Sequence, residues 1–212
     1  MQTVQRQAVQ TQERSFLIRL LLLALFFSAG VILGQVLSGR IPADTEEELR
    51  RYLTDYFSLS DAPPVNRQLL LSTLLIYFRY PMLAFLLGFA SAGVVLLPVL
   101  TAAYGFFLSF SVCCFTASFG RGGILLALAV FGLRCVVTLP CYFSMAVPAL
   151  QHSVSLAAMS FGRSGRRTLP VQYGAMWWIR FGAVTGILTV GVFADLFLGP
   201  ELLELVLNRI LA

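Results

Sequence analysis

The feature that most constrains this chain is a long stretch without any charged side chain, from residue 80 to residue 120. A helix needs about 20 mainly apolar residues to cross a bilayer, so this stretch is long enough for two crossings. Over the whole chain only 12% of the residues are charged and 58% are hydrophobic. A soluble domain has about 25% charged residues. A chain with half that share has too few charged side chains to cover a water-exposed surface. The sequence therefore predicts an all-α polytopic membrane protein with about five transmembrane helices.

The polar borders of the apolar runs divide the chain into two parts. Residues 1–15 are polar and rich in glutamine, and they predict a short cytoplasmic tail. Residues 16–212 are predicted to form a single membrane domain. Its first apolar run has Arg19 near its start, where the side chain can reach the lipid headgroups. The run is too long for the apolar part of a typical signal peptide and no clear cleavage site follows it, so we expect a retained first span.

Proline and glycine mark the turns between the remaining spans. Pro98 and Gly105 favour a hinge inside the charge-free stretch, and the glycines of residues 119–123 favour a second turn. Pro200 is expected to end the last span, before a short amphipathic tail helix. The second and third spans are short, so a re-entrant pair that does not fully cross is the alternative for them. The predicted spans are residues 16–37, 81–99, 102–119, 124–149 and 177–198.

Residues 38–80 form the one substantial polar segment, and we expect this segment to be extracytoplasmic. Within it, residues 45–57 combine a capping-box pattern with favourable Glu–Arg spacing, so they predict an amphipathic helix. Three alternatives are open for this helix: it lies on the membrane surface, packs against the spans or docks a partner protein. Its apolar face consists of Leu49, Tyr52, Leu53, Tyr56 and Phe57.

The arginines do not decide the orientation, because an arrangement with a cytoplasmic N-terminus places equal numbers of loop and tail arginines on the two sides. We favour that arrangement because Arg6, Arg14 and Arg19 lie at or before the start of the first span. The arginine cluster of residues 163–167 also has no acidic neighbours. Residues 150–176 are then a cytoplasmic loop, the C-terminus is extracytoplasmic, and the expected location is the cell membrane.

The chain lacks the residue patterns that catalysis or cofactor binding requires. No acidic residue occurs between Asp61 and Asp195, the single histidine is His152, and no glycine-rich nucleotide-binding loop is present. The cysteines lie in apolar runs without metal or redox spacing, so we expect packing residues. The arginines are too scattered for a nucleic-acid interface. We therefore predict no enzyme activity, no cofactor, no metal site and no nucleic-acid partner, with membrane lipid as an expected contact.

Arg134 is the residue of the predicted spans that most needs an explanation. A charge near the bilayer middle is costly, so its side chain should face the protein interior and have a partner. Asp195 is the acidic residue available in the spans, but we expect it to be a solvated helix end at a different depth. Carbonyl groups freed by Pro140 are a second possible partner. Three roles stay open for Arg134: an anion path, a contact with another protein, or a structural link between helices.

Small residues are frequent in the spans, and Gly182 and Gly186 have the spacing of a helix-packing motif. Close helix packing explains this spacing without a ligand, and it suits a rigid scaffold and a transporter equally. Trp177 and Trp178, at the start of the last predicted span, have the position of interfacial belt residues.

Taken together, these features resemble the stage II sporulation protein M family of small bacterial membrane proteins. The order of polar tail, first span, polar segment and further spans agrees with that family. Two stretches carry the resemblance, LLGFASAGVVLLPVLTAAYGFFLSF and RCVVTLPCY. In the second stretch the family often has Gln or His where this chain has Arg134. The positions that match the family's glycine, proline and polar pattern are Gly88, Gly93, Pro98, Gly105, Arg134 and Pro140.

This resemblance implies a non-catalytic membrane scaffold or anchor for cell-wall hydrolases in sporulation, during septal peptidoglycan remodelling and engulfment, or in a related envelope process. The implied protein partners are extracytoplasmic peptidoglycan hydrolases, which carry out the chemistry. The alternative is a small transporter or permease subunit, in which Arg134 lines an anion path and helix breaks at Pro98 and Pro140 bind substrate. Only the alternative predicts flux across a membrane.

Overall fold

The computed structural model describes residues 2–40, 67–160 and 174–211, and every regular element in these ranges is a helix. The fold is therefore all-α, as the composition predicts. The elements in chain order are α1 (Gln2–Ser38), α3 (Arg67–Leu87), α4 (Gly93–Ala127), the π-helical turn η1 (Leu128–Gly132), α5 (Leu133–Ser160) and α6 (Ala175–Leu211).

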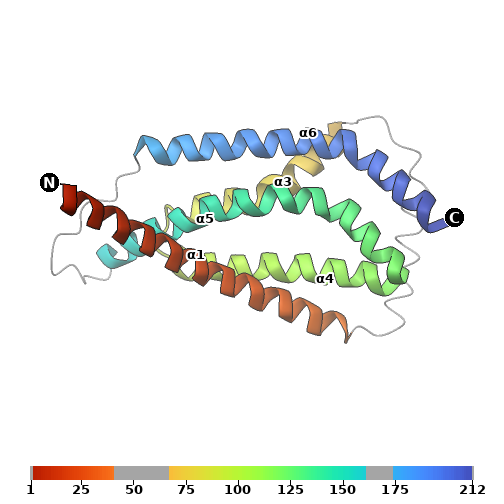
Figure 1. Cartoon of the computed structure of the whole chain (residues 1–212), viewed down its shortest axis with the longest axis horizontal. Coiled ribbons are helices and arrows are strands. Elements are labelled where there is room, and N and C mark those ends of the chain that lie inside the picture. Colours follow the sequence, from red (N-terminus) through yellow and green to blue (C-terminus); the bar gives the residue numbers. More distant parts are fainter. Residues whose placement is uncertain (1, 41–66, 161–173, 212) are drawn as a thin grey trace.

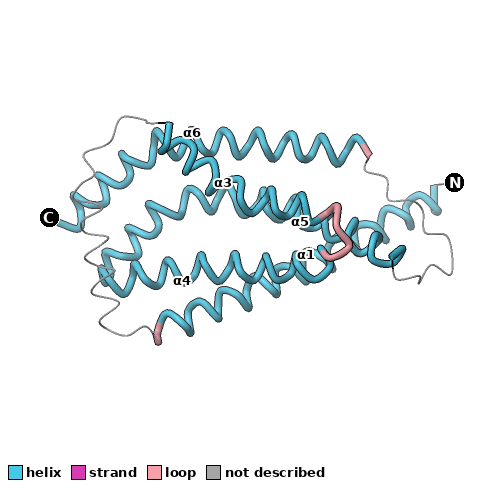
Figure 2. The backbone as a smooth tube through the Cα atoms, turned by 180° about the vertical axis from the view of Figure 1, so that it is seen from behind, coloured by secondary structure: helices cyan, strands magenta, loops and turns pink. Residues whose placement is uncertain are grey.

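The long helices run along one common axis and alternate in direction (Figure 1). The helices α1, α4 and α6 run away from the end that holds the N-terminus, and α3 and α5 run back toward it. Figure 2 shows the same path from behind. The two chain termini consequently lie at opposite ends of the bundle (Figures 1 and 2).

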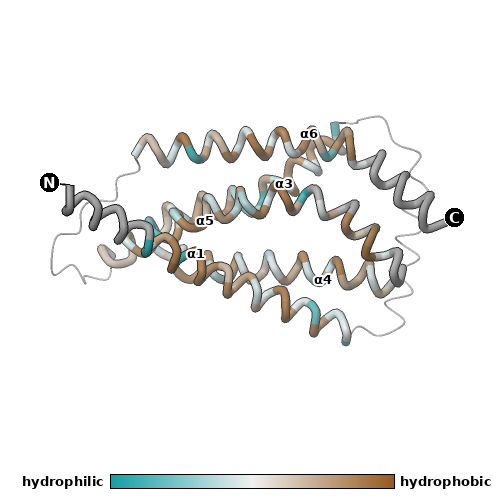
Figure 3. Tube along the Cα trace, viewed as in Figure 1, coloured by the Kyte–Doolittle hydropathy of each residue, from teal (hydrophilic) through white to brown (hydrophobic). Residues whose placement is uncertain are grey.

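Four helical segments among the described residues are long and apolar enough to cross a membrane: Arg14–Ser38, Leu70–Leu87, Gly93–Ala117 and Ala175–Gly199. Many of their outward-facing side chains are large and apolar, as a surface in contact with lipid tails requires, and apolar residues recur along the bundle in Figure 3. Helix α5 contacts all four of the others and carries many of the buried core residues. The protein is thus a polytopic membrane protein with α5 at its centre.

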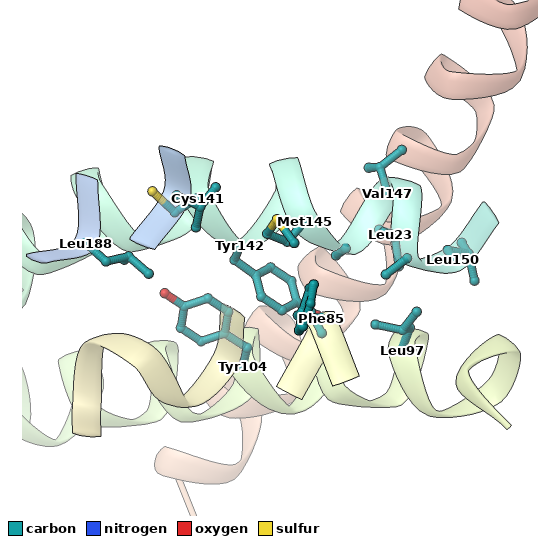
Figure 4. Packing of buried hydrophobic residues seen from close by; sticks show 14 of the residues in the cluster. Leu23, Phe85, Leu97, Tyr104, Cys141, Tyr142, Met145, Val147, Leu150 and Leu188 are labelled. Carbon is teal, nitrogen blue, oxygen red and sulfur yellow. The ribbon is translucent and has the colours of Figure 1, made fainter. Parts of the chain in front are cut away.

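The buried core forms where α5 meets its neighbours. Tyr142 and Met145 of α5 are 0% and 1% exposed. Figure 4 shows them among Leu23, Leu97 and Leu188, which come from α1, α4 and α6. Since protein interiors are close-packed, a change of volume on this face of α5 is felt by several helices at once.

Helices α1 and α4 pack closely because glycines face the backbone of the opposite helix. A methyl group at Gly34 of α1 would lie 2.7 Å from the carbonyl oxygen of Phe106 in α4. A methyl group at Gly30 would collide with the carbonyl group of Ala102. The contacts advance in the same direction along both helices, so α1 and α4 are parallel. Gly30 and Gly34 have the small-residue spacing that permits such an approach.

The first turn within the charge-free stretch lies at residues 88–92, so the predicted hinge at Pro98–Gly105 is wrong. Helix α4 passes through both residues. A helix that stops inside a membrane leaves backbone groups without partners, whereas a proline in a continuing helix removes only one hydrogen bond. The predicted spans 81–99 and 102–119 are accordingly replaced by the end of α3 and the first part of α4.

The backbone of residues 119–123, where the second turn is predicted, is helical and belongs to α4. Gly123 packs against the backbone of Phe115, which lies more than two helical turns earlier and would be far away in a straight helix. Phe131 of η1 contacts Phe115 as well, with ring centroids 5.6 Å apart. The chain therefore reverses by a sharp bend that starts the return through α5.

Helices extend into both segments that the sequence places between spans. Helix α3 begins at Arg67, so the last part of the predicted segment 38–80 is helical. Helix α5 extends to Ser160, so the first part of the predicted loop 150–176 is helical. Both helices continue because their apolar side chains still have neighbours to pack against; Leu150, for example, is 3% exposed.

The last helix also differs from its prediction. Helix α6 continues through Pro200 to Leu211, so Pro200 does not end it. A proline can bend a helix without terminating it. The predicted amphipathic helix at residues 45–57 and the arginine cluster of residues 163–167 lie outside the described residues.

Candidate functional site

Arg134 and Asp195 form an ion pair between α5 and α6, with 2.7 Å between Nη2 and Oδ2. The two side chains are 22% and 11% exposed. The expectation that Asp195 is a solvated helix end is therefore wrong. Because a charge in an apolar environment needs a partner, each residue explains the presence of the other. Among the roles left open for Arg134, a structural link between helices fits this geometry.

Two local features position the guanidinium of Arg134. The residue is the second of α5, which begins directly after η1, and a wide π-helical turn rotates the residues beyond it relative to a continuous α-helix. The guanidinium also lies over the ring of Tyr77 in α3, 5.6 Å from the ring centroid. Arg134 thus contacts α3 and α6 from α5, and a carbonyl freed by Pro140 is not needed as its partner.

A second polar contact, the tyrosine–threonine seam, joins α4 and α5 and consists of Thr101, Tyr104, Thr138 and Tyr142. The hydroxyl oxygens of Thr101 and Tyr142 are 2.7 Å apart, and those of Tyr104 and Thr138 are also 2.7 Å apart. Each threonine donates to the carbonyl oxygen four residues earlier in its own helix. Each tyrosine is therefore the donor toward its threonine, and all four hydroxyls are satisfied inside the bundle.

A groove opens beside this seam between α3, α4 and α5, and we call it the Arg79 groove. It encloses a cavity of ≈ 120 Å³. Tyr80 stacks on Tyr104 with ring centroids 4.1 Å apart, and Nη2 of Arg79 donates to the Tyr80 hydroxyl over 2.8 Å. The groove is lined by Ile76, Arg79, Tyr80, Phe107, Ser111 and Arg134, among others.

Arg79 is the residue that the sequence reading misses, because that reading treats it as the polar border of the next span. In the structure α3 begins at Arg67, and Arg79 lies near the middle of the Leu70–Leu87 span. Among the described residues no carboxylate lies within ion-pair distance of Arg79. The sequence does contain a signal for the depth of Arg79. The apolar run of residues 69–78 joins the next apolar run if one arginine is allowed inside a span.

Gly88 and Gly93 frame the turn between α3 and α4, which rests on α5. A methyl group at Gly88 would lie 3.1 Å from the Ala149 side chain. A methyl group at Gly93 would collide with the carbonyl oxygen of Leu87 and the hydroxyl of Ser153. That hydroxyl donates to the Leu87 carbonyl over 2.8 Å. Close packing of the turn therefore requires a glycine at position 93 and leaves little room for a side chain at position 88.

The other predicted site residues do not converge on one place. Pro98 is buried within α4, and Gly105 of α4 faces the backbone of Phe27 in α1. Pro140 is exposed on α5. Five predicted docking residues lie outside the described residues, namely Leu49, Tyr52, Leu53, Tyr56 and Phe57.

The predicted packing role of Gly182 and Gly186 is wrong within the bundle, because a methyl group at either position would meet no other atom within 4 Å. The motif that packs is instead the Gly30 and Gly34 pair of α1. At the start of α6, Trp178 is 54% exposed, as a belt residue would be. Trp177 is 4% exposed and stacks on Phe85 with ring centroids 5.3 Å apart, so it is a packing residue.

The remaining chemistry-bearing residues are dispersed. The four cysteines are free thiols within the helices. His152 lies on α5 and packs edge-on against Trp177, with ring centroids 4.8 Å apart. No group of three or more His, Cys, Asp or Glu side chains within the described ranges could hold a metal ion. The clusters that the fold does assemble are thus the ion pair, the seam and the Arg79 groove.

Comparison of the chain with protein-family models, with curated proteins and with solved structures finds no match.

Proposed function

We propose that the protein is a non-catalytic membrane scaffold that anchors cell-wall hydrolases during sporulation or a related envelope process. The observation that carries this proposal is the use of polar side chains in contacts between helices. The Arg134–Asp195 pair ties α5 to α6, and the tyrosine–threonine seam ties α5 to α4. A bundle linked in this way has the fixed shape that an anchor needs.

Close backbone packing supports the same proposal. The glycines of α1 lie against the α4 backbone, and the turn between α3 and α4 is seated on Ala149 and Ser153 of α5. Interlocked helices of this kind resist the relative movement of helices that transport requires. The partner class is supplied by the resemblance to the stage II sporulation protein M family, and the docking surface is proposed to include the apolar face of residues 45–57.

Copurification tests this proposal. The full-length chain, tagged at its C-terminus and expressed in its native membrane, is crosslinked, solubilised and isolated, and its partners are identified by mass spectrometry. We expect peptidoglycan hydrolases to be enriched. Leu49→Glu with Tyr56→Glu should remove them, because charges on the apolar face oppose its burial.

Thr54→Glu is the matched control, since it adds a charge next to the apolar face and should leave the partners bound. If the wild-type chain retains no hydrolase, the scaffold proposal is wrong. If hydrolases stay bound to the double variant, the docking role of residues 45–57 is wrong while the scaffold proposal stands.

A second candidate, a small transporter or permease subunit, is favoured by the Arg79 groove, because this groove holds a cation near the middle of a span. An anion path lined by Arg134 has less support, because Asp195 neutralises the charge of that residue. Purified protein in liposomes tests it by anion flux. Flux that disappears in Arg79→Gln or Arg134→Gln would replace the scaffold with a transporter.

A further inference from the structure

Arg79 lies deep within its membrane-spanning helix. The residue lies next to the centre of the Leu70–Leu87 span. Its neighbour Tyr80 stacks on Tyr104, which lies next to the centre of the Gly93–Ala117 span, so the depths of the two helices agree. A charged side chain at such a depth is costly and marks a functional site by default.

The charge of Arg79 is not neutralised within the described part of the chain. Its guanidinium donates to the uncharged Tyr80 hydroxyl and lies 4.6 Å from the Tyr80 ring centroid. Across the groove, Arg134 already has its carboxylate partner in Asp195. The Arg79 groove therefore carries one net positive charge, and an anion that enters it has Arg79 to bind.

The surroundings of the groove favour an anion that brings its own apolar part. Ile76 and Phe107, on the lining of the groove, are 45% and 55% exposed on the outside of the bundle. The cavity of ≈ 120 Å³ has room for several waters or for a small polar group, but its lining is mainly apolar. A free, fully hydrated anion would have to leave water to reach it.

We propose that the Arg79 groove binds the headgroup phosphate of an anionic phospholipid. The phosphate pairs with Arg79 and accepts hydrogen bonds from its free N–H groups, because guanidinium is well matched to phosphate. The acyl chains lie over Ile76 and Phe107. Local thinning of the bilayer around an arginine brings the headgroup toward this depth. This inference is independent of the scaffold proposal.

Native mass spectrometry of the full-length protein in detergent tests the site. Phosphatidylglycerol and phosphatidylcholine with identical acyl chains are added in turn, so that only the headgroup differs. We expect phosphatidylglycerol to bind about tenfold more tightly, and Arg79→Gln to abolish this preference. Arg180→Gln removes another exposed arginine, on α6, and should keep the preference.

A conservative variant and a competing anion test the same site. Arg79→Lys retains the charge and should retain most of the preference, which separates a lost ligand from a misfolded bundle. Inorganic phosphate added in excess should not displace phosphatidylglycerol. Equal binding of the two lipids, an unchanged preference in Arg79→Gln, or displacement by inorganic phosphate would each overturn the assignment of an anionic lipid.

Discussion

The guanidinium of Arg134 donates to the carboxylate of Asp195 across 61 positions of sequence, over 2.7 Å. The pair joins the start of α5 to the later part of α6, and its two charges neutralise each other away from bulk water. This relationship accounts for the Arg134 charge that the sequence leaves without a partner.

Removing one partner of this pair is expected to destabilise the bundle more than removing both. Asp195→Leu leaves the half-buried Arg134 without a counter-charge and should lower the free energy of unfolding by about 3 kcal/mol. Arg134→Met combined with Asp195→Leu should recover most of that loss, because no unpaired charge remains. Unfolding in mixed micelles measures both variants, and equal losses would contradict a coupled pair.

The contact between α1 and α4 should be sensitive to a single methyl group. Gly30→Ala places a Cβ against the Ala102 carbonyl group, so the helices must separate. We expect a loss of about 1–3 kcal/mol in the free energy of unfolding, the usual range for overpacking. Gly182→Ala is the matched control on α6, where the added methyl meets nothing, and it should leave the melting temperature unchanged.

The tyrosine–threonine seam should contribute modestly to stability. Tyr142→Phe removes the hydrogen bond to Thr101, whose hydroxyl still donates to a carbonyl of its own helix. Hydrogen bonds between membrane helices average about 0.6 kcal/mol, so the expected loss is of that order. A double-mutant cycle with Thr101→Val isolates the pairwise energy. A coupling energy of zero would show that the two hydroxyls do not stabilise each other.

The orientation in the membrane is testable by cysteine accessibility. In a variant without native cysteines, Gly39→Cys and Gly174→Cys place thiols at opposite ends of the bundle, after α1 and before α6 (Figure 1). With a cytoplasmic N-terminus, a membrane-impermeant maleimide should label only Gly39→Cys in intact cells. Permeabilised cells, in which both should react, provide the control. Labelling of Gly174→Cys alone would reverse the proposed orientation.

Hydropathy predicts the first and last spans well because their apolar runs have clear polar borders. Residues 16–37 fall within α1 and residues 177–198 within α6. It fails at Pro98, since proline and glycine are weak boundary signals where lipid surrounds the backbone. It fails again at Arg79, because hydropathy marks an arginine as the border of a span, whereas the energetic cost of a buried charge can be met inside the bundle.

The sequence also does not predict which glycines pack against another helix. Gly182 and Gly186 have the same spacing as Gly30 and Gly34, yet only the α1 pair faces another backbone. Spacing fixes which residues share a helix face, whereas the neighbour on that face depends on how all the helices assemble.

Composition and the length of the hydrophobic runs are enough to predict a helical protein embedded in a membrane, because both act locally and need no partner. The contact of Arg134 with Asp195, the central place of α5 and the position of Arg79 on a groove emerge only when the helices pack together. Each of these depends on contacts between residues far apart in the chain, and the energy of a buried charge is defined only when its surroundings are known.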